Sequence, residues 1–279
     1  MKKLFVLFIT PLLLCGCKPR GVPEPERHYD DYGAFLGRSD NDVTSFSNYS
    51  YISCELDEFG DSNITRLNSK GVHFLAYLNV GSLETYRDYY EDYESVTFKD
   101  YDNWPDERWI DVSNTVWQNF VVNTLAKNFR DRGAFGFYLD NVDVYSVAKE
   151  ENLNYSAFEQ GIKKIIEGIT DLGLFVMING GAEYLEDIKD DEDDAIGRIW
   201  GYHQEEVFSL ITDYENNGFG KQTTEDSDYY KEIAAMMKSL GKEVFLLEYT
   251  TDTQLIDCIK SYCDALGYHY YISNNVDLK

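Results

Sequence analysis

The stretch Gly136-Phe137-Tyr138-Leu139-Asp140-Asn141-Val142-Asp143 joins an apolar run to two carboxylates. Residues 134–139 are apolar or aromatic and have the length of a buried strand. A strand that is buried on both faces has no room for acids, so Asp140 and Asp143 are expected where the strand leaves the core. In parallel α/β folds, ligands bind at the carboxyl ends of the strands. The stretch therefore marks a candidate functional site.

The rest of the chain repeats this pattern of short apolar runs separated by helix-length segments. Eight strands that alternate with helices predict a parallel sheet, and this number at this length favours a single α/β domain, a (β/α)8 TIM barrel. A doubly wound sheet is the alternative. Residues 108–112 are expected to form a further short strand inside the third connection. The eight strands are predicted at 33–37, 51–56, 73–80, 135–140, 174–179, 196–202, 244–249 and 268–273, and helices at 63–70, 115–130, 155–170, 182–188, 229–240 and 253–266.

The first 17 residues resemble a bacterial lipoprotein signal peptide. Lys2 and Lys3 precede an apolar stretch from residue 4 to 14 that is too short to span a membrane as a mature helix. Leu14-Cys15-Gly16-Cys17 resembles a lipobox, which predicts cleavage before Cys17 and lipidation of its thiol; an ordinary signal peptide is the alternative. We expect an exported protein that is lipid-anchored to a bacterial membrane, facing the periplasm or the cell surface. Residues 18–30 then form a tether and 31–279 a single domain.

The composition limits the partners. With 50 acidic and 25 basic residues, the net charge of −25 excludes nucleic acid, whose phosphates need the opposite sign. The charge serves either to keep an exported protein soluble or to attract a cationic substrate. There is no CxxC pair and there are only four histidines, so no metal is expected. Neither a Walker motif nor a GxSxG elbow occurs, and no cofactor is predicted.

Acidic side chains near the ends of different predicted strands favour glycoside hydrolysis, which uses a pair of carboxylates. Asp140 is the first candidate. Glu205, just beyond the sixth predicted strand, is the second and is expected to act as acid/base. Glu206 and Glu248 are the alternatives for this second position.

Other polar and aromatic residues near the same edge are candidates for binding substrate. Asp143 is expected to bind a sugar hydroxyl or amine, unless it caps the following segment, and Glu248 to orient substrate through a hydrogen bond. Because pyranose rings stack on flat apolar rings, Tyr145 and Tyr202 are expected to contact the sugar, whereas Tyr77 and Tyr138 are predicted to be core residues. The candidate substrate-binding residues are Asn79, Asp143, Tyr145, Asn179, Tyr202 and Glu248.

Six segments follow one another in the order found in a known family of barrels. They are 76–82 with Tyr86-Arg87, 108–112, 137–145, 178–181, 204–206 and 244–249. On these segments the chain resembles glycoside hydrolase family 114, the endo-α-1,4-polygalactosaminidases. The most specific part is Asp140-Asn141-Val142-Asp143, and the resemblance extends from residue 33 to the C-terminus.

The resemblance implies a (β/α)8 barrel that cleaves α-1,4-linked galactosamine-containing polysaccharide inside the chain. It implies Asp140 and Glu205 as the catalytic carboxylates. A partly deacetylated aminosugar polymer is cationic, which is consistent with the negative charge of the protein. A non-catalytic barrel that binds glycan, and a hydrolase of neutral polysaccharide, are the alternatives.

Overall fold

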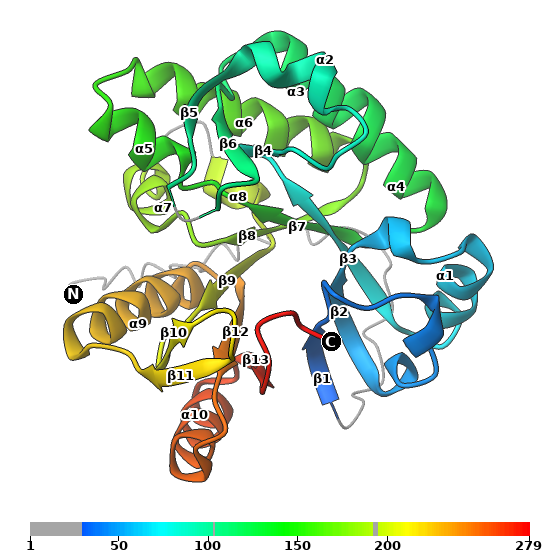
Figure 1. The fold of residues 1–279 in the computed structure, drawn as a ribbon, viewed down its shortest axis with the longest axis vertical. Coiled ribbons are helices and arrows are strands. Elements are labelled where there is room, and N and C mark those ends of the chain that lie inside the picture. The colour runs from blue at the N-terminus through cyan, green and yellow to red at the C-terminus, as the bar shows by residue number, and fades with distance from the viewer. Residues whose placement is uncertain (1–29, 103, 192–194) are drawn as a thin grey trace, which may run out of the picture.

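The structure is a computed structural model that describes residues 30–102, 104–191 and 195–279 (Figure 1). Its centre is a sheet of eight parallel strands in the order β1-β2-β3-β7-β8-β9-β12-β13. The sheet curves into a nearly closed barrel with helices around it, which confirms the predicted (β/α)8 TIM barrel. The strands are β1 (Asp30–Ala34), β2 (Tyr49–Cys54), β3 (His73–Asn79), β7 (Gly136–Asp140), β8 (Phe175–Asn179), β9 (Gly201–Glu205), β12 (Glu243–Tyr249) and β13 (His269–Ser273).

The helices pack on the outside of this sheet. Leu67, Ile165 and Ile259 are examples of helical side chains that are almost completely buried against it. The α-helices are α1 (Asp61–Asn68), α2 (Tyr90–Tyr93), α3 (Thr115–Phe120), α4 (Lys127–Arg132), α5 (Val144–Glu150), α6 (Tyr155–Asp171), α7 (Ala182–Ile188), α8 (Ala195–Arg198), α9 (Thr224–Ser239) and α10 (Thr253–Leu266), with a π-helical stretch, Val121–Ala126, between α3 and α4.

The main difference from the predicted elements concerns the sixth strand. It was expected at 196–202, but 195–198 form α8 and the strand runs from Gly201 to Glu205. A short apolar run does not distinguish a buried helical turn from a strand, and Ile196 and Ile199 are buried in the core in either case. The shift moves Glu205 from beyond the strand to its last position. β1 and β2 also begin two or three residues earlier than predicted.

The two edge strands of the sheet, β1 and β13, lie next to each other. Nδ1 of His269 on β13 contacts a carboxylate oxygen of Asp31 on β1, and Nε2 lies 3.4 Å from the Glu243 carboxylate on β12. Side chains therefore help to join the two ends of the sheet.

Two small antiparallel sheets extend from the carboxyl ends of the barrel strands (Figure 1). One follows β3 and consists of β4 (Ser82–Glu84), β5 (Thr97–Asp100) and β6 (Glu107–Ile110), which includes the predicted extra strand at 108–112. The other follows β9 and is the hairpin of β10 (Ser209–Asp213) and β11 (Gly218–Lys221). Trp104 and Tyr214, which lie in the turns of the two sheets, meet edge to face with ring centroids 5.5 Å apart. The two extensions thus meet across the same face of the barrel.

No helix in the described part of the chain has both the length and the apolar character needed to cross a membrane. The signal peptide, Cys17 and most of the tether lie outside the described residues. Their predicted roles stay predictions.

Candidate active site

The candidate site is built from the last residue of five barrel strands. These residues are Asn79 on β3, Asp140 on β7, Asn179 on β8, Glu205 on β9 and Tyr249 on β12. Asn79 and Asp140 are directly opposite each other in the sheet. Because neighbouring parallel strands end at the same level, residues far apart in sequence come together at this edge.

Asp140 and Glu205 share one hydrogen-bond donor. Nδ2 of Asn179 lies 2.9 Å from Oδ1 of Asp140 and 3.0 Å from Oε1 of Glu205, so the two protons of the amide serve two carboxylates. Each carboxylate is only partly exposed. The structure therefore brings together the two acids that the sequence indicated, with Asn179, a predicted substrate ligand, between them.

Three tyrosine hydroxyls complete the hydrogen bonding of this pair. Tyr77 donates to Oδ2 of Asp140 at 2.9 Å. Tyr138 and Tyr249 donate to the two oxygens of Glu205 at 3.1 and 2.6 Å. Tyr77 and Tyr138 are buried, as predicted, but their hydroxyls point at the carboxylates.

Burial makes both carboxylic acids harder to ionise. It raises the pKa of Asp140 to about 6, and the negative charge of Glu205 raises it as well, while the bonds from Asn179 and Tyr77 oppose the shift. Burial also raises the pKa of Glu205, and the nearby charge of Glu206 acts in the same direction. Carboxyl groups whose pKa values are raised by burial are suited to acid/base chemistry.

His203, which the sequence analysis did not single out, orients Asn179. Its ring is completely buried, and burial lowers its pKa to about 3, so the ring is neutral. Nδ1 lies 2.7 Å from Oδ1 of Asn179. The Asn179 amide nitrogen already donates to two carboxylates, so its oxygen must accept, and His203 therefore carries the proton on Nδ1.

A third acid, Glu107 on β6, reaches the site from the small sheet above the barrel. Its carboxylate accepts from Ser82 Oγ, and Nδ2 of Asn79 lies 3.1 Å from Oε2. Burial raises the pKa of Glu107, and the negative charge of Asp140 acts in the same direction. Asn79, predicted to bind substrate, thus lies at the strand end but is held by Glu107 and Ser82. The sequence offered no signal for Glu107 because it follows no barrel strand.

Asp143 supports the loop that presents Asn179. Its carboxylate accepts from the N–H of Gly181 at 3.1 Å. Gly180 and Gly181 have φ of +63° and +65°, and a Cβ on Gly180 would lie 2.8 Å from an Asp143 oxygen. The turn therefore requires glycine. Burial raises the pKa of Asp143 to about 6. Its contact with a sugar stays a prediction.

The two other glutamates point elsewhere. The Glu206 carboxylate accepts from the Ile211 N–H on β10. The Glu248 carboxylate is completely buried and accepts from the N–H groups of Phe208 and Ser209 at 2.8–3.1 Å and from the Ser209 hydroxyl at 2.6 Å. The structure therefore places Glu205 beside Asp140, and it places neither Glu206 nor Glu248 there.

The two tyrosines expected to stack on sugar lie in the outer core. Tyr145 on α5 is 1% exposed and donates to Asp187 on α7 at 2.7 Å. Tyr202 is fully buried and donates to Gln204. Because side chains alternate along a strand, Tyr202 faces the helices when His203 and Glu205 face the barrel interior. The structure brings neither ring to the carboxylate pair.

The same alternation could have identified the tyrosines that the sequence analysis assigned only to the core. Each interior-facing strand end is preceded, two residues earlier, by another interior-facing residue. Tyr77 precedes Asn79, Tyr138 precedes Asp140, and His203 precedes Glu205. Counting back by two from the acids would therefore have indicated these hydroxyl and imidazole groups.

A (β/α)8 barrel that presents two bridged carboxylates at the carboxyl ends of its strands has the architecture and the site of a glycoside hydrolase. Residues 35–276 match the sequence profile of glycoside-hydrolase family GH114, and the chain belongs to this family. This confirms the resemblance seen in the sequence.

Two solved structures share the fold. The glycoside hydrolase domain of PelA from Pseudomonas aeruginosa is 15% identical with a TM-score of 0.74, and the match covers 89% of this chain and 95% of that one. Ega3 from Aspergillus fumigatus, in complex with galactosamine, is 17% identical with a TM-score of 0.70 over 93% of this chain and 96% of that one. No curated protein sequence matches the chain.

Proposed function

We propose that this glycoside hydrolase cleaves α-1,4-linked galactosamine-containing polysaccharide at internal bonds, with Asp140 and Glu205 as its catalytic pair. The observation that carries the assignment is the Asn179 amide, which donates to both carboxylates at 2.9 and 3.0 Å. The family supports hydrolysis of glycosidic bonds. The galactosamine bound to Ega3 supports the type of sugar.

The separation of the pair favours retention of configuration. Two oxygens that bond the same nitrogen can be no farther apart than the sum of the two distances, about 5.9 Å. Carboxyl groups of retaining glycosidases are about 5–5.5 Å apart, and those of inverting enzymes roughly 6.5–9.5 Å apart to leave room for water. The Asp140–Glu205 geometry is closer to the first arrangement.

In the proposed mechanism Glu205 is the acid/base and Asp140 the nucleophile. Glu205 donates its proton to the glycosidic oxygen while Asp140 attacks the anomeric carbon, so the bond to the leaving sugar breaks as a glycosyl ester forms. Glu205 then takes a proton from water, which attacks the ester and releases Asp140. Burial raises the pKa of both carboxyl groups, so the division of roles is decided by the substrate with an aryl leaving group described below.

The charge of the protein supports a cationic aminosugar polymer as substrate. The site contains Glu107 and Asp143 in addition to the catalytic pair, and the net charge of the chain is −25. A negative field attracts a polymer with protonated amines, and salt weakens this attraction. We also propose that the enzyme is exported and held at a membrane by lipid on Cys17, on the basis of the lipobox-like sequence.

The test is product release by residues 18–279, without the cysteine that is expected to carry the lipid, on acetylated and deacetylated galactosaminogalactan. Asp140→Asn and Glu205→Gln serve as variants. The native protein should release oligosaccharides of the original anomeric configuration, seen by NMR, and both variants should release almost none.

A substrate with an aryl leaving group distinguishes the two roles. Such a leaving group needs no protonation, so Glu205→Gln should still form the glycosyl ester and Asp140→Asn should not. Bound polymer with no product from the native protein would favour a glycan-binding barrel. Inverted product would contradict the proposed nucleophile.

A further inference from the structure

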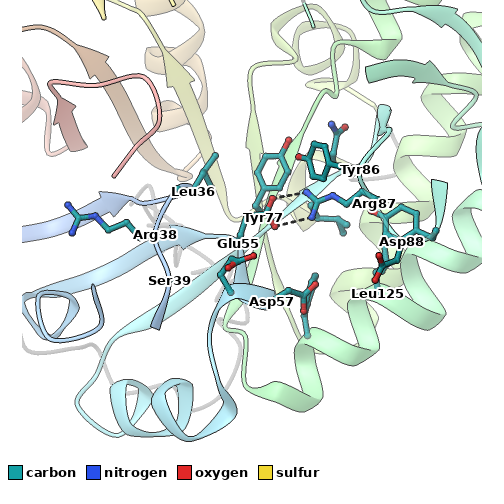
Figure 2. A pocket seen from close by; sticks show the side chains of 16 residues that line it. Leu36, Arg38, Ser39, Glu55, Asp57, Tyr77, Tyr86, Arg87, Asp88 and Leu125 are labelled. Carbon is teal, nitrogen blue, oxygen red and sulfur yellow. Dashed lines mark hydrogen bonds and ion pairs between the residues drawn. The ribbon is translucent and has the colours of Figure 1, made fainter. Parts of the chain in front are cut away.

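A cavity of about 600 Å³ lies beside the carboxyl ends of β1, β2 and β3 (Figure 2). Its inner wall is Tyr77, whose hydroxyl donates to Asp140. Leu36, Glu55 and Asp88 line it farther out, on the connections that follow β1, β2 and β4. The volume is in the range of sites that hold small organic ligands. A polymer in the active site would therefore meet this space as its chain continues past Asp140.

The rim of the cavity carries an exposed but well-held aromatic ring. In the described part of the chain, Tyr86 is the most exposed of the large apolar and aromatic residues, at 65%. Its hydroxyl nevertheless donates to Oε1 of Glu84 at 2.7 Å, and the guanidinium of Arg87 lies 5.1 Å from its ring centroid. A ring that is fixed in place before binding loses little entropy when a sugar stacks on it.

Arg87 connects the Tyr86 ring to Tyr77 on the inner wall of the cavity. Arg87 makes a two-pronged bond to Glu55 at 2.7 and 3.1 Å (Figure 2). It also donates to the Glu84 carboxylate at 2.6 and 3.0 Å. Its guanidinium also lies 5.8 Å from the ring centroid of Tyr77. The position of Tyr86 is thus set relative to Tyr77, and through Tyr77 relative to Asp140.

The charge of the cavity indicates which sugar it suits. The positive charge of Arg87 is shared between two carboxylates, which leaves this cluster net negative. Glu58 and Asp88 add two exposed carboxylates to the wall, and no described residue pairs with either. Arg38, the other cation of the wall, lies 3.7 Å from Asp42. A protonated amine is therefore favoured here over a carboxylate.

We propose that this cavity is a distal subsite for a protonated hexosamine unit, which stacks on Tyr86 and places its ammonium group near Glu58 and Asp88. The inference deepens the proposed function, since it rests on an aminosugar polymer lying in the active site. It adds a binding contact that is remote from the chemistry, so its loss should weaken binding of long chains more than it slows the cleavage step.

Binding to a catalytically inactive background tests the subsite separately from hydrolysis. Asp140→Asn would be titrated by calorimetry with α-1,4-galactosamine oligosaccharides of two and six residues, with and without Tyr86→Ala. Loss of the ring should weaken binding of the hexamer about three- to tenfold, the range of aromatic contacts, and leave the dimer unchanged. Tyr86→Phe, which keeps the ring, should behave more like the parent.

Two controls separate stacking from charge. Tyr155→Ala removes a tyrosine that is 46% exposed and lies beside Lys149, but that does not line the cavity, and it should change nothing. Glu58→Gln combined with Asp88→Asn should reduce the salt dependence of hexamer binding. The fully acetylated hexamer should bind more weakly than the deacetylated one.

The outcomes distinguish this proposal from the proposed function. Hexamer affinity that depends on Tyr86 supports the subsite even when the native protein hydrolyses nothing. Equal affinity of the parent and Tyr86→Ala for the hexamer, or no binding of either oligosaccharide, overturns it. Equal binding of acetylated and deacetylated hexamers overturns its preference for a cation.

Discussion

Replacing Asn179 with alanine should damage catalysis without removing either of the two carboxylates proposed to be catalytic. The change deletes two hydrogen bonds to carboxylate oxygens, at 2.9 and 3.0 Å. Taking about 1.5 kcal/mol for each bond to a charged group gives roughly 3 kcal/mol, which corresponds to about a hundredfold in rate. Because the lost bonds favoured the ionised forms, the pKa of Asp140 and that of Glu205 should both rise further.

The assay is kcat/KM on a soluble galactosamine polymer between pH 4 and 8, with the melting temperature as a check on folding. The acidic limb of the profile for Asn179→Ala should move up by about one pH unit, which corresponds to the free energy of one such bond. Tyr138→Phe, which removes a single 3.1 Å bond to Glu205, is the graded control and should cost about tenfold. An Asn179→Ala enzyme within about threefold of native activity, with an unchanged profile, would refute this reasoning.

Three further perturbations test other parts of the structure. The pKa of Asp140 is raised from 3.8 to about 6, so the folded state holds this proton more tightly than the unfolded state, and the contribution of Asp140 to stability falls as the pH rises from about 4 to 6. Asp140→Asn should therefore be more stable than native at pH 7, by about 3 kcal/mol in chemical denaturation, and a less stable variant would contradict this. Glu248→Ala leaves the buried N–H groups of Phe208 and Ser209 unpaired and should lower the free energy of unfolding by about 2–4 kcal/mol. An unchanged melting temperature together with a higher KM would instead support the predicted contact of Glu248 with substrate. Trp104→Ala and Tyr214→Ala should each weaken polymer binding. Because the two rings are in contact, a double-mutant cycle on polymer affinity should give a coupling of about 1 kcal/mol. Additive effects of the two changes would show that the contact between the rings does not contribute to binding.

Much of the site could be predicted because polar residues interrupt apolar runs. Asp140 and Asn179 directly end such runs, so local sequence identified them as strand ends. Glu205 was harder to place because two glutamates stand side by side. The choice between them depends on which one faces the barrel interior, and that follows from where β9 begins, at Gly201 rather than Ile196.

Glu107 could not be predicted because it reaches the site from a strand outside the barrel. Its contacts with Asn79 and Ser82 span 28 and 25 residues and depend on how the β4-β6-β5 sheet folds over β3. Tyr86-Arg87 belongs to the segments that resemble the family, but the sequence does not show that the Tyr86 ring is exposed. Its place at the rim of the cavity is known only from the tertiary structure.

The amino-acid sequence alone predicts the alternation of strands and helices, and with it the barrel and the family. These could be predicted because hydrophobic periodicity and the residues at strand ends are properties of short segments. The chemistry depends on closure of the barrel. Tyr77 and Asp140 are 63 residues apart in sequence, Asn179 and Asp140 are 39 apart, and Tyr138 and Glu205 are 67 apart. Hydrogen bonds act over about 3 Å, so no local pattern can specify such pairs. The tertiary structure alone decides that one amide joins the two acids.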